Sequence, residues 1–151
     1  MIFVTVGSIQ FDDLVRRIDD DVQSGRIKEK VIIQIGNGSY EPRFCEFFRT
    51  APGLDSYHAR AALVIGHGGT GTTLEILEKG LRLISVCNPG MIDNHQDEFL
   101  DALARRGFVT YCRDLTQLPQ LIETLLAKPP PAAVNVSSFF GNVIADLEAA
   151  E

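Results

Sequence analysis

Short apolar runs alternate with longer amphipathic stretches along this chain. The apolar runs cover residues 2–6, 31–35, 62–65 and 82–86, with weaker ones at 44–48 and 108–111, and each is typical of a buried strand. Between them, apolar residues at helical spacing predict helices over 11–22, 54–60, 94–107 and 115–126, and one more that is capped by Gly80. Strands that alternate with helices predict an α/β, Rossmann-like fold, in which a doubly wound parallel sheet carries helices on both faces.

The length and the proline distribution divide the chain into a domain and a tail. The chain has 151 residues, which suits one domain, and we expect residues 1–128 to form it. Three prolines at 129–131 follow as a stiff spacer, and apolar residues then recur at helical spacing over 140–147. Residues 129–151 are therefore predicted to be a hinge and a C-terminal amphipathic helix, which either docks on a partner or packs on its own domain.

Composition and charge restrict the possible function classes. Apolar residues make up 45% of the chain and charged residues 23%, a balance typical of a globular domain. The formal net charge is −6, so the sequence lacks the overall basic character of a nucleic-acid-binding protein. No apolar run is long enough to span a bilayer and no basic segment precedes residues 2–6, so we expect a cytoplasmic protein without a signal peptide. The three cysteines lie far apart, and we expect neither a metal site nor a cofactor.

Four polar segments follow the predicted strands. They are residues 7–8, 36–39, 66–71 and 88–96. Ligands of open parallel sheets bind outside the carboxyl ends of the strands, where these segments are expected to meet. The search for a functional site therefore narrows to these four loops.

The glycine-rich segment 66–75 carries the strongest chemical signal. Its glycines let a ligand approach the backbone, and the helix that follows begins with unpaired N–H groups and the positive end of its dipole. Together these features predict an anion site suited to a diphosphate. His67 either donates a hydrogen bond to a phosphate oxygen or bonds a neighbouring carbonyl, and Thr70 and Thr72 offer hydroxyl groups. Glu75 stands three residues after Thr72, a spacing that also fits a capping box at the helix start.

Residues 66–71 also match the dinucleotide pattern G-x-G-x-x-G. Two features argue against a nicotinamide dinucleotide. The pattern follows the fourth predicted strand rather than the first, and the next strand ends in Val86-Cys87-Asn88-Pro89, without the acid that binds a ribose. A nucleotide-sugar epimerase or another NAD-dependent enzyme is therefore the less favoured interpretation.

A second polar cluster lies at the start of the helix predicted over 94–107. Asn94, His95 and Gln96 carry neutral polar groups that suit the hydroxyls of a sugar. The structural alternative is a helix N-cap at Asn94 followed by acidic residues in the first turn. Neutral polar side chains beside a diphosphate loop favour a nucleotide-sugar site.

Four motifs, in this order and at this spacing, resemble those of the small donor-binding subunits of bipartite glycosyltransferases. The motifs are IFVTVG at 2–7, QIGN at 34–37, VIGHGGTGT at 64–72 and DNHQ at 93–96. The group includes the cytosolic subunit of the eukaryotic enzyme that adds the second N-acetylglucosamine to dolichol-diphosphate. It also includes the small subunit of bacterial exopolysaccharide and capsule glycosyltransferases. Both look like the C-terminal half of family-28, GT-B-type enzymes, and the resemblance covers about residues 1–127.

The resemblance implies a site for a UDP-sugar, with His67 and Gln96 as the catalytic residues. The residues that it implies for UDP-sugar binding are Gly7, Ser8, Gly36, Asn37, Gly68, Gly69, Thr70, Gly71, Thr72, Glu75, Asn94 and His95. In this arrangement His67 and the backbone of 69–72 hold the diphosphate, and Glu75 binds the ribose hydroxyls. Gln96 contacts the donor sugar, and the 36–39 loop lies near uracil. Ser8 departs mildly from the family, which often has threonine at this position.

The resemblance also implies an inverting transfer of a hexose or hexose derivative from UDP-sugar to a lipid-linked saccharide acceptor. GT-B enzymes place the acceptor site, and often the general base, in their other half. The expected partner is therefore a membrane-associated acceptor-binding subunit, which would hold this cytoplasmic chain at the membrane periphery. The alternative is a non-catalytic UDP-sugar-binding regulatory module, which would keep the binding residues and need no acceptor partner.

Overall fold

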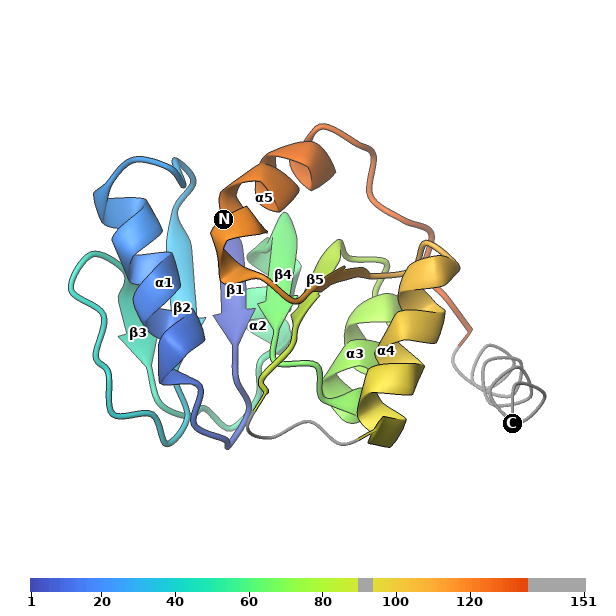
Figure 1. The fold of residues 1–151 in the computed structure, drawn as a ribbon, viewed down its shortest axis with the longest axis horizontal. Helices are drawn as coiled ribbons and strands as arrows, with labels where there is room; N and C mark the ends of the chain where they lie inside the picture. Colours follow the sequence, from blue (N-terminus) through green and yellow to red (C-terminus); the bar gives the residue numbers. More distant parts are fainter. Residues whose placement is uncertain (90–93, 136–151) are drawn as a thin grey trace.

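The computed structural model describes residues 1–89 and 94–135, apart from the side chains of Asn94 and His95. Within these residues, six parallel strands form one sheet. The strand order is β3-β2-β1-β4-β5-β6 (Figure 1). The strands are β1 (Ile2–Thr5), β2 (Val31–Gln34), β3 (Glu46–Phe48), β4 (Leu63–Gly66), β5 (Leu83–Val86) and β6 (Thr110–Cys112). This arrangement confirms the predicted α/β, Rossmann-like, doubly wound fold.

Helices cover both faces of this sheet (Figure 1). They are α1 (Asp12–Gln23), α2 (Asp55–Arg60), α3 (Thr70–Glu78), α4 (Asn94–Arg105) and α5 (Leu118–Leu126), with a 3₁₀ turn η1 (Leu115–Gln117) before α5. Apolar residues of α1 and α5 pack on one face, and those of α2, α3 and α4 pack on the other. The predicted helices of the domain are thus present, with bounds that differ from the predictions by a few residues.

The central strands are apolar on both sides because both faces of the sheet are covered. In β1, Ile2 and Val4 join the core beneath α1 and α5, whereas Phe3 joins the opposite core. Phe3 stacks on Tyr57 of α2 with ring centroids 5.1 Å apart. The continuous apolar runs of the sequence therefore reflect burial on two faces.

The chain changes direction across the sheet between β1 and β4. β2 and β3 extend from one side of β1, and β4, β5 and β6 extend from the other. Thr5, the last residue of β1, is in register with Gln34 of β2 and Gly66 of β4. The loops that follow these strands lie at the lower edge of the sheet in Figure 1, toward which the arrow of β1 points. A switch point of this kind is where open α/β sheets bind their ligands.

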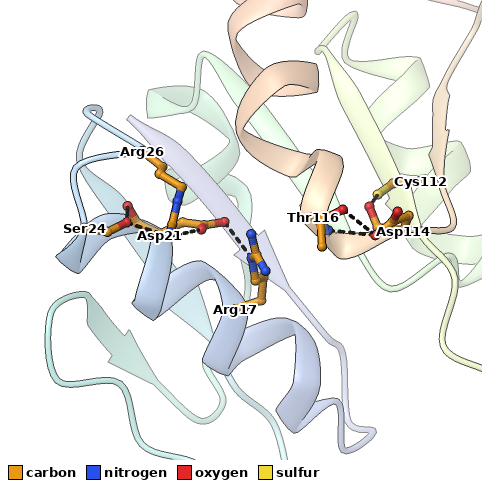
Figure 2. A network of polar contacts seen from close by, with 7 residues as sticks. All are labelled: Arg17, Asp21, Ser24, Arg26, Cys112, Asp114 and Thr116. Atoms are coloured by element: carbon orange, nitrogen blue, oxygen red, sulfur yellow. Dashed lines mark hydrogen bonds and ion pairs between the residues drawn. The ribbon is translucent and has the colours of Figure 1, made fainter.

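Two polar networks stabilise the end of α1 and the turn before α5 (Figure 2). The fully buried carboxylate of Asp21, near the end of α1, pairs with Arg17 at 3.2 Å and with Arg26 at 3.1 Å. In the second network, Asp114 accepts hydrogen bonds from the amide and the hydroxyl of Thr116 and so caps η1. These contacts are local: the first network holds the last turn of α1 to the loop that follows it, and the second caps the turn that leads into α5.

The described part of the proline-rich segment runs back along the domain. The amide of Val134 donates to the carbonyl of Leu77 in α3 at 3.2 Å. Gly80, predicted as the cap of α3, follows the actual C-cap Lys79 and takes a positive φ of 69°. The amphipathic helix predicted beyond residue 135 lies outside the described residues. Among the described residues, no helix combines the length and apolar character that a bilayer crossing requires.

Candidate functional site

Loops after β1, β2 and β4 meet at the carboxyl edge of the sheet, as predicted. Asn37 donates from its side chain to the carbonyl of Ser8 at 2.8 Å, which joins the loop after β2 to the loop after β1. The imidazole of His67, in the loop after β4, lies against Gly7. The structure therefore brings Gly7, Ser8, Asn37 and His67 together at the switch point, where open α/β sheets have their ligand crevice outside the carboxyl ends of the strands.

Helix α3 starts at the glycine turn without a side-chain cap. Its N-cap is Gly69, whose carbonyl accepts from both the amide of Thr73 at 2.9 Å and the hydroxyl of Thr73 at 2.7 Å. Thr70 is the first helical residue, and Thr70 and Gly71 are exposed. Because Gly69 has no side chain to accept from the first-turn amides, these amides and the positive end of the helix dipole are presented at the glycine turn.

The capping-box interpretation of Thr72 and Glu75 is wrong. Thr72 lies inside α3, two residues after its start, and the N-cap makes no side-chain hydrogen bond. The Glu75 carboxylate contacts Lys79 in the next turn, at 3.4 Å, instead of returning to the helix start. Glu75 is therefore available for another role.

The His67 ring is held between two glycines. A Cβ at Gly7 would lie 3.1 Å from the ring's Cε1, and a Cβ at Gly69 would lie 2.5 Å from its Nε2. The ring's Nδ1 is 3.4 Å from the carbonyl oxygen of Thr5. Since a carbonyl only accepts, Nδ1 carries the proton in this contact, and Nε2 is left as an acceptor in the neutral ring. Of the two roles predicted for His67, the bond to a neighbouring carbonyl is therefore made by Nδ1. Nε2 lies beside the glycine turn.

Burial lowers the pKa of His67 below its ordinary value, and the hydrogen bond to Thr5 opposes this shift without cancelling it. The free protein therefore holds a neutral His67 at neutral pH. A phosphate dianion beside Nε2 would favour the doubly protonated ring, because an opposite charge at hydrogen-bond distance stabilises the cation. With Nδ1 bonded to Thr5, His67 can donate to a phosphate through Nε2 only when this nitrogen also carries a proton. The negative charge of a bound phosphate would favour that doubly protonated ring.

Gln96, at the start of α4, reaches the same turn from the opposite side. Its side-chain amide donates to the carbonyl of Gly68. Gly68 has a positive φ of 88°, and a Cβ there would lie 2.9 Å from Leu100 of α4. Glycine is therefore required at position 68 both by its backbone conformation and by the close approach of α4. The side chains of Asn94 and His95, predicted beside Gln96, lie outside the described part of the chain.

The first turn of α4 is tied to β6 by a second polar group. Tyr111 donates from its hydroxyl to Asp97 at 2.7 Å, and Arg113 donates to the same oxygen at 3.0 Å. Burial and then the bond to Asp97 raise the pKa of Tyr111, so its hydroxyl stays protonated and donates. This contact fixes the helical turn from which Gln96 extends.

Gln34 is a structural residue of the crevice that the sequence interpretation did not single out. Its side-chain amide is buried and bonds both backbone groups of Gly7, accepting from its N–H at 3.0 Å and donating to its carbonyl at 2.6 Å. It also donates to the carbonyl of Arg49 at 2.7 Å and accepts from the Thr5 hydroxyl at 2.7 Å. The sequence did carry a signal for this role, because Gln34 is a single polar residue inside the apolar run 31–35. A polar side chain buried in a strand is expected to have hydrogen-bond partners.

The loop after β2 is shaped by its contacts with α1 and with the residue that follows β3. Gly36 has a positive φ of 58°, and a Cβ there would lie 2.5 Å from the carbonyl oxygen of Gly7. Arg49 donates to the carbonyl of Gly38 at 2.8 Å, and Asp12 accepts from the amide of Ser39 at 2.9 Å. The loop therefore packs closely beside Gly7, and its predicted contact with a base stays a prediction.

Residues 1–148 match the family model described as the glycosyltransferase family 28 C-terminal domain. The chain belongs to this family. The match includes the glycine turn, His67 and Gln96, so the crevice described above lies inside the family 28 domain.

Curated relatives of this family 28 domain include proteins named UDP-N-acetylglucosamine transferase subunit ALG13. The chain is 34% identical to the Homo sapiens protein over 122 residues, which cover 74% of this chain and 11% of the relative. It is 36% identical to the Mus musculus protein over 121 residues, which cover 73% of this chain and 10% of the relative. The chain thus spans about a tenth of the length of these two relatives.

Solved structures share the fold of this family 28 domain. The solution structure of ALG13 superposes with a TM-score of 0.66 at 22% identity and covers 94% of each chain. The crystal structure of Acinetobacter baumannii MurG gives a TM-score of 0.66 at 21% identity and covers 83% of this chain and 40% of that one. Identities this low establish the common architecture alone.

Proposed function

We propose that this chain is the donor-binding subunit of an inverting glycosyltransferase that uses a UDP-sugar. The observation that carries the proposal is the turn 66–72, where bare amides and the dipole of α3 face a crevice at the switch point of the sheet. Membership of family 28 supports a nucleotide-sugar as the anionic ligand. The names of the ALG13 relatives support UDP-N-acetylglucosamine as the donor.

The crevice suits stabilisation of a departing nucleoside diphosphate. Negative charge grows on the diphosphate as the bond to the sugar breaks, and pre-oriented amides of 70–72 would stabilise it without reorganisation. His67 would add a hydrogen bond from Nε2 once the ligand's charge keeps its ring protonated. Gln96, whose side chain already reaches Gly68, would contact the donor sugar next to the diphosphate.

We propose further that a second subunit supplies the acceptor site. The relatives are named as subunits of a transferase, and the MurG chain is longer, with this chain's match covering 40% of it. The partner would bind a lipid-linked saccharide, provide the general base that activates its hydroxyl, and hold this chain at the cytoplasmic face of a membrane.

Two measurements test the proposal. Calorimetric titration with UDP, UDP-N-acetylglucosamine and NAD should give binding of the two uridine nucleotides and none of NAD. Transfer of the sugar to a lipid-linked acceptor should then require a co-expressed partner subunit. Binding without transfer in the presence of the partner would favour the regulatory-module alternative. Binding of NAD in place of UDP would refute the proposal.

A further inference from the structure

Helices α2 and α3 cover the same face of the sheet (Figure 1). Between them, Asp55 and His58 of α2 form a polar cluster with Glu75 of α3 and with its C-cap residue Lys79. Its centre is the Lys79 ammonium, which lies 2.6 Å from Asp55, 2.7 Å from Nδ1 of His58 and 3.4 Å from Glu75. The carboxylates and the imidazole have the composition of a metal site, with ligand atoms within 4.8 Å of one another. Because the ammonium already bonds all three, the cation of this cluster is Lys79.

The protonation states of the cluster follow from its hydrogen bonds. An ammonium only donates, so Nδ1 of His58 accepts and the ring of His58 is neutral. Burial and then the charge of Lys79 lower the pKa of His58, in agreement with this assignment. For Lys79, burial lowers the pKa, but the bonds to Asp55 and Glu75 outweigh it and raise the pKa overall. Lys79 is therefore a fixed positive charge.

The anchoring of Lys79 differs from that of an ordinary pair on a helix surface. An exposed Glu and Lys one helical turn apart attract each other only weakly, because both side chains move freely. Here two short bonds to α2 hold Lys79, and His58 is only 2% exposed. The contact with Glu75 therefore restricts the orientation of a carboxylate that is half exposed.

The position of Glu75 relates this cluster to the crevice. Glu75 follows the N-cap Gly69 by six residues, or about 9 Å along the helix axis. A nucleoside diphosphate that binds Gly69 through its phosphates would extend its ribose over that distance. Only one oxygen of Glu75 contacts Lys79, and a carboxylate has about four acceptor positions, so the group can still accept from two hydroxyls.

We propose that Lys79, anchored by Asp55 and His58, is a positioning residue that orients the Glu75 carboxylate toward the ribose hydroxyls of the donor nucleotide. The inference rests on the proposed function, because it requires the diphosphate to lie at the glycine turn. A purely structural role for Lys79, as a tie between α2 and α3, is the competing explanation. The two explanations differ in their effect on recognition of the ribose.

The test compares the affinities for UDP and 2′-deoxy-UDP in variants of Lys79. Lys79→Gln and Lys79→Met both remove the charge, and glutamine can still donate to His58 and keep the helices tied. Loss of the charge changes the attraction for the diphosphate equally in both ligands, so the ratio of affinities isolates the ribose contact. Lys30→Gln, which removes a lysine from an exposed pair with Glu46, is the matched control.

The wild type should bind UDP roughly tenfold or more tightly than 2′-deoxy-UDP, as expected for a hydrogen bond to a charged group. In Lys79→Gln and Lys79→Met the ratio should fall toward one, while Lys79→Arg should restore much of it and Lys30→Gln should leave it unchanged. A ratio that stays at the wild-type value in both neutral variants overturns the inference, whatever happens to their melting temperature. Equal binding of both nucleotides by the wild type overturns it while leaving the proposed function intact. Failure of the wild type to bind either nucleotide refutes the proposed function itself.

Discussion

Gly71 gives the sharpest test of the glycine turn, because one methyl group there should have opposite effects on stability and on binding. Gly71 is the second residue of α3 and is exposed, and a Cβ at this position would meet no protein atom within 4 Å. Its φ is not positive, so alanine fits the backbone without strain. In the free protein the substitution Gly71→Ala is therefore expected to be favourable.

The size of each effect follows from this geometry. Alanine in place of a helical glycine stabilises by about 0.5–1 kcal/mol, since it restricts the unfolded chain. For a chain of this length, that gain raises the melting temperature by roughly 1–4 °C. The same methyl group would project toward the exposed amides that are proposed to hold the diphosphate. Even a displacement that weakens one charge-assisted bond by about 1.4 kcal/mol lowers the affinity tenfold.

The assay combines thermal unfolding without ligand and calorimetric titration with UDP. Thr124→Ala is the matched control, because Thr124 is exposed in α5, on the other face of the sheet, and gains about as much helix propensity. Gly71→Ala should be more stable than the wild type and bind UDP at least tenfold more weakly. The control should be more stable with unchanged binding. If Gly71→Ala raises the melting temperature and leaves UDP affinity intact, the turn does not hold the diphosphate.

Three further substitutions test the groups that support the crevice and α1. Gln34→Met should lower the free energy of unfolding by about 2–4 kcal/mol in urea denaturation, because buried partners such as the amide of Gly7 lose their hydrogen bonds; a loss below about 1 kcal/mol would contradict this. Asp21→Ala should lower the free energy of unfolding by about 2 kcal/mol, because it breaks two ion pairs of a buried carboxylate; the loss is limited because the partly exposed arginines can rehydrate. Asp13→Ala, in an exposed pair, should change this free energy by less than about 0.5 kcal/mol. The pKa of His67 is lowered by burial, so its contribution to stability is complete above the unfolded value of about 6.5 and is lost as the pH falls through the folded value. Thermal unfolding between pH 8 and pH 5 should therefore show a smaller decline in His67→Asn than in the wild type, and equal declines would exclude the effect.

The fold and the place of the crevice were predictable because they depend on patterns repeated along the chain. The strands follow short apolar runs, and the loops after β1, β2 and β4 are marked by glycines with positive φ, namely Gly7, Gly36 and Gly68. Parallel strands bring their carboxyl ends to one edge wherever the intervening helices pack. The pattern of strands and loops in the sequence was therefore enough to predict that Gly7, His67 and Gln96 lie close together.

The start of α3 and the anchored contact between Glu75 and Lys79 were not predictable in the same way. A threonine followed three residues later by glutamate is a frequent capping pattern, but the backbone of Gly69 already ends the turn in an extended conformation with a ψ of 137°. The Thr73 hydroxyl then bonds Gly69 itself, which places Thr72 inside the helix. The partner of Glu75 is Lys79, whose position depends on Asp55, 24 residues earlier in the chain. Contacts between two helices of this kind leave no periodic signal.

The charge of the chain explains why the site is built from backbone groups. A protein with a formal net charge of −6 repels a diphosphate at long range, so the attraction has to be short-ranged and local. The amides at the start of α3 provide such attraction at hydrogen-bond distance, and salt screens contacts at that distance poorly. In the proposed site, His67 would add positive charge only when a ligand is present, because its pKa is lowered in the free protein. Affinity in such a site depends on how closely the ligand reaches the backbone, and this is why one methyl group at Gly71 should affect binding more than a change in ionic strength.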